Sequence, residues 1–223
     1  MPPGPHSLLK RYALPGPEIE RRSIARSTEA LAGLALPPDL LAIAARMIYA
    51  IADPTIVPFI RIHPDLATAA IDALRSGCRI VCDVKMVVSC LNHRAADRLR
   101  CQITTSIDDP GIALRSQQSG YPRAAEAFLR EGAALTGAVA VVGNAPTALL
   151  AVLDLINAGI AKPACIIGIP VGFVAATEAK DALQHGSTPF VTVLGTRGGS
   201  ALAVAAINAL FLLATASPEP SGS

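Results

Sequence analysis

The second half of the chain repeats one pattern of apolar and polar positions: a short apolar run, a glycine-rich turn and a longer helical segment. The runs lie at 139–142, 164–167 and 190–194, and a glycine directly follows each of them. Runs this short fit strands that are buried on both faces better than they fit helices. The order of strand, turn and helix is typical of a parallel sheet with right-handed crossovers. The helices that it predicts are 148–157, a stretch ending at 183, and 200–215.

The first half of the chain predicts further elements of the same α/β fold. Two helices, expected at 18–31 and 37–50 with a loop at 33–36 between them, form an N-terminal helical segment. The remaining elements are helices at about 64–75 and 122–132 and strands at 79–82 and 101–105. The 223 residues therefore predict a single α/β domain with a parallel sheet, and the Pro-, Gly- and Ser-rich stretches 1–9 and 217–223 are expected to be loose.

Composition excludes several classes of function. With 52% hydrophobic and only 16% charged residues, the chain is the opposite of a disordered protein. A net charge of +2, no Trp and 4% aromatic residues provide neither the basic surface nor the stacking side chains that nucleic-acid binding needs. The most apolar stretch, 201–216, contains Asn208 and is shorter than the roughly 20 residues of a membrane-spanning helix. Because residues 1–6 show no signal-peptide pattern, the expected location is the cytoplasm.

The five cysteines predict neither a disulfide framework nor a metal site. Their number is odd, which does not fit a set of paired bridges. Four of them lie with His93 in the segment 78–101, but their spacings match no paired zinc ligands. Free cysteine is also among the residue types most often buried, so we expect these to be core residues.

The carboxyl ends of the predicted strands carry the residues best placed for binding, because ligands of open parallel sheets sit at that edge. These residues are Asp83, Asn144, 168–172 and 197–200. Glycine allows a ligand to approach the backbone, and helix N-termini offer free N–H groups to carboxylates or phosphates. The same glycines also suit tight turns without any ligand, so both interpretations stand. Neither G-x-G-x-x-G nor G-x-x-x-x-G-K-[ST] occurs, which disfavours a nucleotide-binding enzyme.

Six short segments, spread over about residues 12–212, carry a family resemblance. The early ones are Glu20-Arg-Arg-Ser-Ile-Ala25, Ala45-Arg-Met-Ile48 and Cys82-Asp-Val-Lys-Met-Val87. The later ones are Val142-Gly-Asn-Ala-Pro-Thr-Ala-Leu149, Gly168-Ile-Pro-Val-Gly-Phe-Val174 with Glu178 and Lys180 following, and Arg197-Gly-Gly-Ser-Ala201. One segment alone would be a weak signal, but the ordered set is specific. The chain resembles the precorrin-8X methylmutase family.

The resemblance implies a Rossmann-like three-layer α/β/α fold and a homodimer with the active site near its interface. The implied activity is that of an isomerase of cobalamin biosynthesis, which needs no metal or organic cofactor. It moves a methyl group from C-11 to C-12 of precorrin-8X or cobalt-precorrin-8, giving hydrogenobyrinate or cobyrinate. Such a rearrangement needs positioning and a proton placed at the ring. The acetate and propionate carboxylates of the tetrapyrrole need Arg, Ser and backbone N–H donors.

The resemblance also implies which residues of this chain bind the substrate. They are Arg22, Ser23, Asn92, Arg123, Gly172, Gly198, Gly199 and Ser200. Arg123 stands in the segment Gly120-Tyr-Pro-Arg123, without the Thr and Ser neighbours of the family motif. On chemistry alone, Ser23 would equally be an ordinary polar residue of a helix.

The largest departure from the family is Tyr49, which stands where the family places its catalytic histidine. At neutral pH an imidazole both gives and takes a proton, whereas a phenol gives one but rarely takes one back. His93, beside Asn92, is the next candidate for proton transfer, although a surface or loop position is the more usual one for such a histidine. Two functions stay open: a methylmutase with Tyr49 in the catalytic position and reduced turnover, and a corrinoid-binding paralogue that does not catalyse. The sequence does not indicate whether the ring already holds cobalt.

Overall fold

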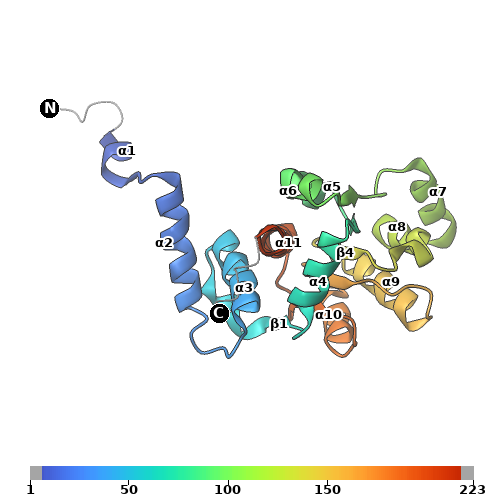
Figure 1. Cartoon of the computed structure of the whole chain (residues 1–223). Helices are drawn as coiled ribbons and strands as arrows, with labels where there is room; N and C mark the ends of the chain where they lie inside the picture. The colour runs from blue at the N-terminus through green and yellow to red at the C-terminus, as the bar shows by residue number, and fades with distance from the viewer. Residues whose placement is uncertain (1–6, 217–223) are drawn as a thin grey trace, which may run out of the picture.

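A six-stranded sheet forms the middle layer of the fold, in a computed structural model that describes residues 7–216 (Figure 1). The strand order is β1-β6-β5-β4-β2-β3. The five strands from β6 to β3 are parallel, and β1 pairs antiparallel with β6. The strands are β1 Ile60–Ile62, β2 Arg79–Cys82, β3 Gln102–Thr104, β4 Val139–Val142, β5 Cys165–Gly168 and β6 Phe190–Val193.

Helices cover both faces of this sheet. Those before β3 are α1 Ser7–Tyr12, α2 Gly16–Glu29, α3 Pro38–Ile51, η1 Pro54–Phe59 (a 3₁₀ helix), α4 Leu66–Arg75, α5 Lys85–Cys90 and α6 His93–Arg98. Those after it are α7 Pro110–Ser119, α8 Arg123–Glu131, the 3₁₀ helix η2 Gly132–Leu135, α9 Pro146–Asn157, α10 Ala176–Gln184 and α11 Ser200–Thr215.

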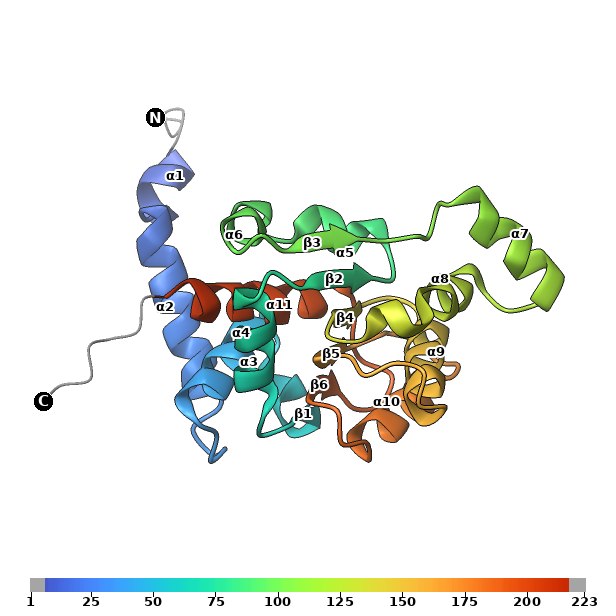
Figure 2. The same ribbon diagram turned by 45° about the vertical axis from the view of Figure 1, so that its right-hand side comes forward.

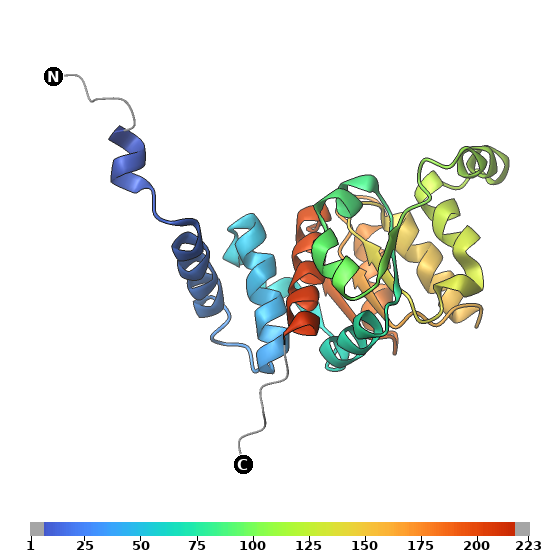
Figure 3. The ribbon, with the colours of Figure 1, turned by 45° about the horizontal axis from the view of Figure 1, so that its top comes forward.

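Alternation along the strands divides the core into two clusters, one on each face of the sheet. Successive strand residues point to opposite faces. Ile80 and Val139 pack with α3, α4 and α11, whereas Val81 and Ala140 pack with α8, α9 and α10. Figures 2 and 3 show the sheet between these two helical layers. The expected three-layer α/β/α fold, with a mostly parallel sheet, is confirmed.

The N-terminal helices α2 and α3 lie outside α11, on the same face of the sheet. α11 packs against α3, and α3 packs against α2, so the three helices follow one another outward from the sheet (Figure 3). Proline at the first positions of α2 and α3 suits helix starts, because it lacks only an N–H that would be unpaired there. The expected helices at 18–31 and 37–50 are confirmed with shifts of one or two residues. α1 and the start of α2 project away from the body (Figure 1).

The short helices α5, α6 and α7 were not predicted, and two further parts of the fold differ from the sequence-based expectation. The edge strand β1, together with η1 before it, was not predicted, because its three residues, Ile-Arg-Ile between Pro58 and Pro64, are too few to establish a strand pattern. The sheet is therefore not wholly parallel. Residues 7–9, expected to be loose, lie in α1; the rest of that expectation, residues 1–6 and 217–223, lies outside the described residues.

The apolar stretch near the C-terminus is α11, which lies between α3 and the sheet. Asn208, its central polar residue, accepts a hydrogen bond from the Asn92 N–H at 2.8 Å and donates one to the Cys90 carbonyl at 3.2 Å. These bonds attach α11 to the loop between α5 and α6. Within residues 7–216, no helix has the length and apolar character required to cross a membrane.

Candidate active site

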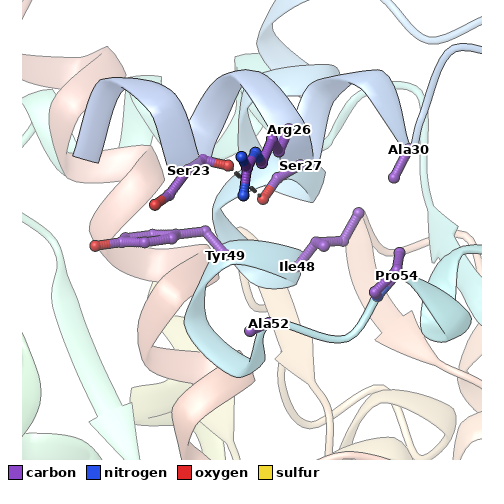
Figure 4. A pocket seen from close by; sticks show the side chains of 8 residues that line it. All are labelled: Ser23, Arg26, Ser27, Ala30, Ile48, Tyr49, Ala52 and Pro54. Carbon is purple, nitrogen blue, oxygen red and sulfur yellow. Dashed lines mark hydrogen bonds between the residues drawn. The ribbon is translucent and has the colours of Figure 1, made fainter. Parts of the chain in front are cut away.

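One face of α2 and one face of α3 enclose a pocket of about 360 Å³ (Figure 4). Residues spaced by three and four positions share a helix face, and this spacing recurs in the lining. The lining residues are Ser23, Arg26, Ser27 and Ala30 from α2, Ile48 and Tyr49 from α3, and Ala52 and Pro54 just beyond α3. The pocket thus brings together two residues that the family resemblance implies for the site, Ser23 and Tyr49.

Tyr49 lies in the last turn of α3, and its side chain reaches from α3 into the gap below Ser23 (Figure 4). The helix stops two residues later, where Ala52 adopts a left-handed backbone conformation with φ of 51°. Tyr49 is 38% exposed, so its ring contacts the protein on one side and is open to a bound molecule on the other. A phenol in this position can donate a hydrogen bond or a proton to a substrate.

Two serine hydroxyls on α2 bond back to their own helix. The Ser23 hydroxyl donates to the Ile19 carbonyl at 2.7 Å, and the Ser27 hydroxyl donates to the Ser23 carbonyl at 2.9 Å. A hydroxyl oxygen that donates in this way keeps lone pairs with which it can accept a hydrogen bond. The Ser23 side chain points toward Tyr49 rather than into the core (Figure 4). It can therefore accept a bond from a substrate or exchange its helix bond for one to a carboxylate.

Arg22, one residue before Ser23, has a carboxylate partner on its own helix. Its Nε donates to Glu18, and Arg21 donates to the same carboxylate through Nε at 2.9 Å. The hydrogen bonds from Arg21 and Arg22 hold the pKa of Glu18 below its usual value. Both guanidinium groups are more than half exposed, so these pairs can exchange with other anions.

The glycine-rich turns implied for substrate binding, which contain Gly172 and residues 198–200, lie at the carboxyl ends of β5 and β6. The Gly172 N–H donates to the Thr196 carbonyl at 3.1 Å, and the Gly199 N–H donates to the Ile169 carbonyl at 2.8 Å. A side chain at Gly198 would lie 2.5 Å from the Ile169 carbonyl oxygen, so only glycine fits there. The two turns, with Ser200 starting α11, form one closely packed unit whose amides at 172 and 199 are already paired.

Asp83, at the carboxyl end of β2, binds backbone rather than an open site. The carboxylate is buried and accepts hydrogen bonds from the N–H groups of Gly143 at 3.1 Å, Asn144 at 2.7 Å and Ala145 at 2.8 Å. Burial raises the pKa of the Asp83 carboxyl, and these three donors partly oppose that rise. Asp83 therefore fixes the turn between β4 and α9, and the expectation that it faces a ligand is replaced by this structural role.

Lys180 on α10 performs a similar task for the turn after β6. Its fully buried ammonium group donates to the Arg197 carbonyl at 2.7 Å. Burial lowers the pKa of Lys180 to about 8, while the nearby Asp181 acts in the opposite direction. The resemblance identified Lys180 as part of a motif, and the structure gives it a specific contact in the turn that contains Gly198 and Gly199.

Asn92 and Arg123 lie elsewhere, and neither lines the pocket between α2 and α3. Asn92 caps α6, its side-chain oxygen accepting from the Ala95 N–H at 3.0 Å. The Nε2 of His93 lies 2.8 Å from the Val88 carbonyl oxygen, so one ring nitrogen is engaged locally. Arg123 is the exposed first residue of α8, and Figure 2 shows α8 and α2 on opposite sides of the sheet. Within one chain, therefore, the implied binding residues form separate groups.

Sequence reasoning missed Arg26 and Ser27, which line the pocket beside Ser23. The signal was present, because positions 23, 26, 27 and 30 share one face of the predicted helix. Among residues 7–216, no group of three or more His, Cys, Asp or Glu side chains could hold a metal ion.

Comparisons with known proteins agree on one family. The sequence model described as precorrin-8X methylmutase matches residues 18–213. A precorrin-8X methylmutase of Pseudomonas aeruginosa is 41% identical over 206 residues, covering 89% of this chain and 96% of that protein. A cobalt-precorrin-8 methylmutase of Priestia megaterium is 35% identical, covering 92% of each chain.

A solved structure extends this likeness to the fold. The precorrin-8X methylmutase of Thermus thermophilus matches with a TM-score of 0.81 and 32% identity, covering 89% of this chain and 96% of that one. The order of segments, the three-layer fold and these relatives lead to the same assignment. The chain belongs to the precorrin-8X methylmutase family.

Proposed function

We propose that this chain acts as a methylmutase of cobalamin biosynthesis on precorrin-8X or cobalt-precorrin-8, moving a methyl group from C-11 to C-12. The relatives named above all carry the name of this enzyme, and none supports a corrinoid-binding paralogue without catalysis. The observation that carries the proposal is the pocket in which Ser23 and Tyr49 meet. In this pocket Ser23 of α2, at the family's substrate-contact position, lies beside Tyr49 of α3, at its proton-transfer position.

The chemistry of this site needs no nucleophile from the protein. The methyl group leaves one ring carbon and joins its neighbour within one bound molecule, so the protein has to hold the ring and supply a proton to it. Tyr49 supplies the proton from its phenol, and the Ser23 hydroxyl holds the ring by a hydrogen bond. Arg22, Asn92, Arg123 and Ser200 bind the peripheral carboxylates, and Gly172, Gly198 and Gly199 shape the turns from which Ser200 is presented.

The separation of these groups supports a homodimer. Helix α8, which begins at Arg123, and the α2–α3 pocket lie on opposite sides of the sheet in one chain, and a second copy would let both contribute to one substrate site. The arm formed by α1 and the start of α2 also carries exposed apolar side chains that suit a partner surface. They are Leu8, Leu9, Tyr12, Leu14 and Ile19. A clean monomer in sedimentation at micromolar concentration would contradict the dimer.

We propose that the enzyme is located in the cytoplasm, and its unpaired cysteines support this location. All five cysteines are free, which is usual in a reducing compartment. Burial raises the pKa of Cys78 to about 12, so the reactive thiolate form is scarce.

The direct test is a single-turnover absorbance assay with precorrin-8X and, separately, with cobalt-precorrin-8. We expect the spectrum of the substrate to change to that of the rearranged corrin in at least one of the two experiments. Comparison of the two assays also determines whether the substrate ring must contain cobalt. If the protein converts neither tetrapyrrole, the proposed function is wrong, and retention without conversion would indicate the corrinoid-binding paralogue instead.

A further inference from the structure

Arg26 is the one basic residue in the lining of the pocket between α2 and α3. It lies one turn of α2 after Ser23, and its guanidinium group reaches into the space between Ser23 and Ser27 (Figure 4). Across the gap are Tyr49 and the apolar side chain of Ile48. Neither the family resemblance nor the sequence pattern assigned a role to this residue.

The other arginines of this region are paired with carboxylates. Arg21 and Arg22 both bind Glu18, and Arg46 of α3 binds Glu20 at 3.3 Å. The carboxylates in these contacts belong to Glu18 and Glu20, the two glutamates in the first half of α2. The positive charges at positions 21, 22 and 46 thus each lie beside a carboxylate of the chain, with Glu18 shared between Arg21 and Arg22.

Arg26 differs from them. Within residues 7–216, no carboxylate oxygen lies within 4.0 Å of its guanidinium nitrogens. Its charge is therefore uncompensated at the wall of a pocket whose other lining groups are hydroxyls and apolar carbons. A guanidinium in such a place favours an anion, and its planar array of N–H donors matches a carboxylate with two parallel hydrogen bonds.

We propose that Arg26 binds a peripheral carboxylate of the tetrapyrrole, an acetate or propionate group, and thereby selects rings with free acids over rings with amidated side chains. The selection follows from charge, because an amide offers one acceptor oxygen and no negative charge, whereas a carboxylate offers two oxygens and balances the guanidinium. The inference rests on the proposed function and adds to it a preference for one chemical form of substrate.

The test compares two corrins by absorbance titration: hydrogenobyrinate, which has free carboxylates, and a derivative of the same ring with amidated side chains. Arg26→Gln removes the charge and keeps a polar side chain on an exposed helix face. We expect its affinity for the free acid to fall about ten- to a hundredfold, as for the loss of one charge-assisted contact. Affinity for the amide should change by less than about threefold, so the preference for the free acid collapses.

Arg21→Gln is the matched control, since it removes the same charge from the same helix but from a residue paired with Glu18. We expect its affinities to match the wild type. If Arg26→Gln binds the free acid as tightly as the wild type, or weakens both corrins equally, the inference is wrong while the proposed function stands. If the wild type binds neither corrin and converts no substrate, both are wrong.

Discussion

The guanidinium of Arg197 binds Thr55, a residue 142 positions earlier in the chain. Its Nη1 donates to the Thr55 carbonyl at 3.1 Å and to the Thr55 hydroxyl at 3.0 Å, and the group lies 5.1 Å from the ring centre of Phe59. Thr55 belongs to η1, directly after the pocket residues Ala52 and Pro54. Arg197 therefore connects the turn after β6 to one wall of the pocket.

Removing this connection should impair the reaction without abolishing the fold. In Arg197→Ala we expect η1 to shift, the pocket wall at Pro54 to loosen, and kcat to fall about 10- to 100-fold, because small misplacements of a substrate are costly. The control is Arg61→Ala. It removes hydrogen bonds to the carbonyls of Pro58 and Ile60, at the C-terminal end of η1, which is the end away from the pocket residues. Equal kinetics for the two variants would contradict this positioning role.

The identity of residue 49 should control the rate of the chemical step. We expect Tyr49→His to raise single-turnover rates, because imidazole both gives and takes a proton at neutral pH. Tyr49→Phe should lower them by about 10²–10⁴, the usual contribution of a general acid. Binding of the corrinoid, followed by absorbance, should change little in either variant.

The opposite outcome for Tyr49 is equally informative. A wild-type rate that Tyr49→Phe leaves unaltered would place the proton transfer at another residue. His93 would then be examined first, although its Nε2 contacts the Val88 carbonyl and it does not line the pocket.

Asp83→Ala should be among the most destabilising single substitutions in the sheet. It leaves the buried N–H of Gly143 and the partly buried N–H groups of Asn144 and Ala145 without their acceptor, and an unpaired buried donor costs about 1–3 kcal/mol. We expect the free energy of unfolding in urea to fall by about 3–5 kcal/mol. Asp154→Ala, at an exposed position of α9, should change it by less than about 0.5 kcal/mol. A loss below about 1 kcal/mol for Asp83→Ala would refute its role in holding the turn.

Lys180 should make stability depend on pH in the alkaline range. Its pKa in the folded protein is about 8, below the usual 10.5, so between these values the unfolded chain binds more protons than the folded one. Stability therefore rises with pH across this window. Relative to Lys180→Met, the wild type should gain about 1–3 kcal/mol between about pH 8 and pH 10.5, measured by urea unfolding. Parallel pH curves for the two proteins would exclude this buried titration.

The sequence predicted the parts of the fold in which local pattern and burial agree. β4 and α11 match their predicted ranges, 139–142 and 200–215. Each is a mainly apolar run next to a glycine, so the sequence indicates both the type of element and where it begins or ends. α5 and α6, six residues each, are too short to show a helical period, and β1 depends on pairing with β6 rather than on its own residues. Such elements are determined by tertiary contacts that single-sequence patterns do not contain.

The candidate site was predicted less completely than the fold. Ser23 and Tyr49 came from the family resemblance, and the structure brings them together. The helix face that Arg26 shares with Ser23 could be read from the sequence, but its lack of a carboxylate partner could not, since that depends on which neighbouring arginines have acidic partners. The contacts of Glu18 and Glu20 determine that, and they depend on side-chain geometry on α2 and α3.

The packing of α3 against α11 sets an order of events during synthesis. The helices that form the pocket precede all six strands along the chain, whereas α11, which packs against α3, follows all of them, and β6, the partner of β1, is the last of the six strands to be translated. Contacts between such distant parts of a chain form late and slowly. Until α11 emerges, the apolar face of α3 is uncovered and open to aggregation or to chaperones. A nascent chain arrested before residue 200 would contain every lining residue of the pocket but would lack the helix that covers the inner face of α3.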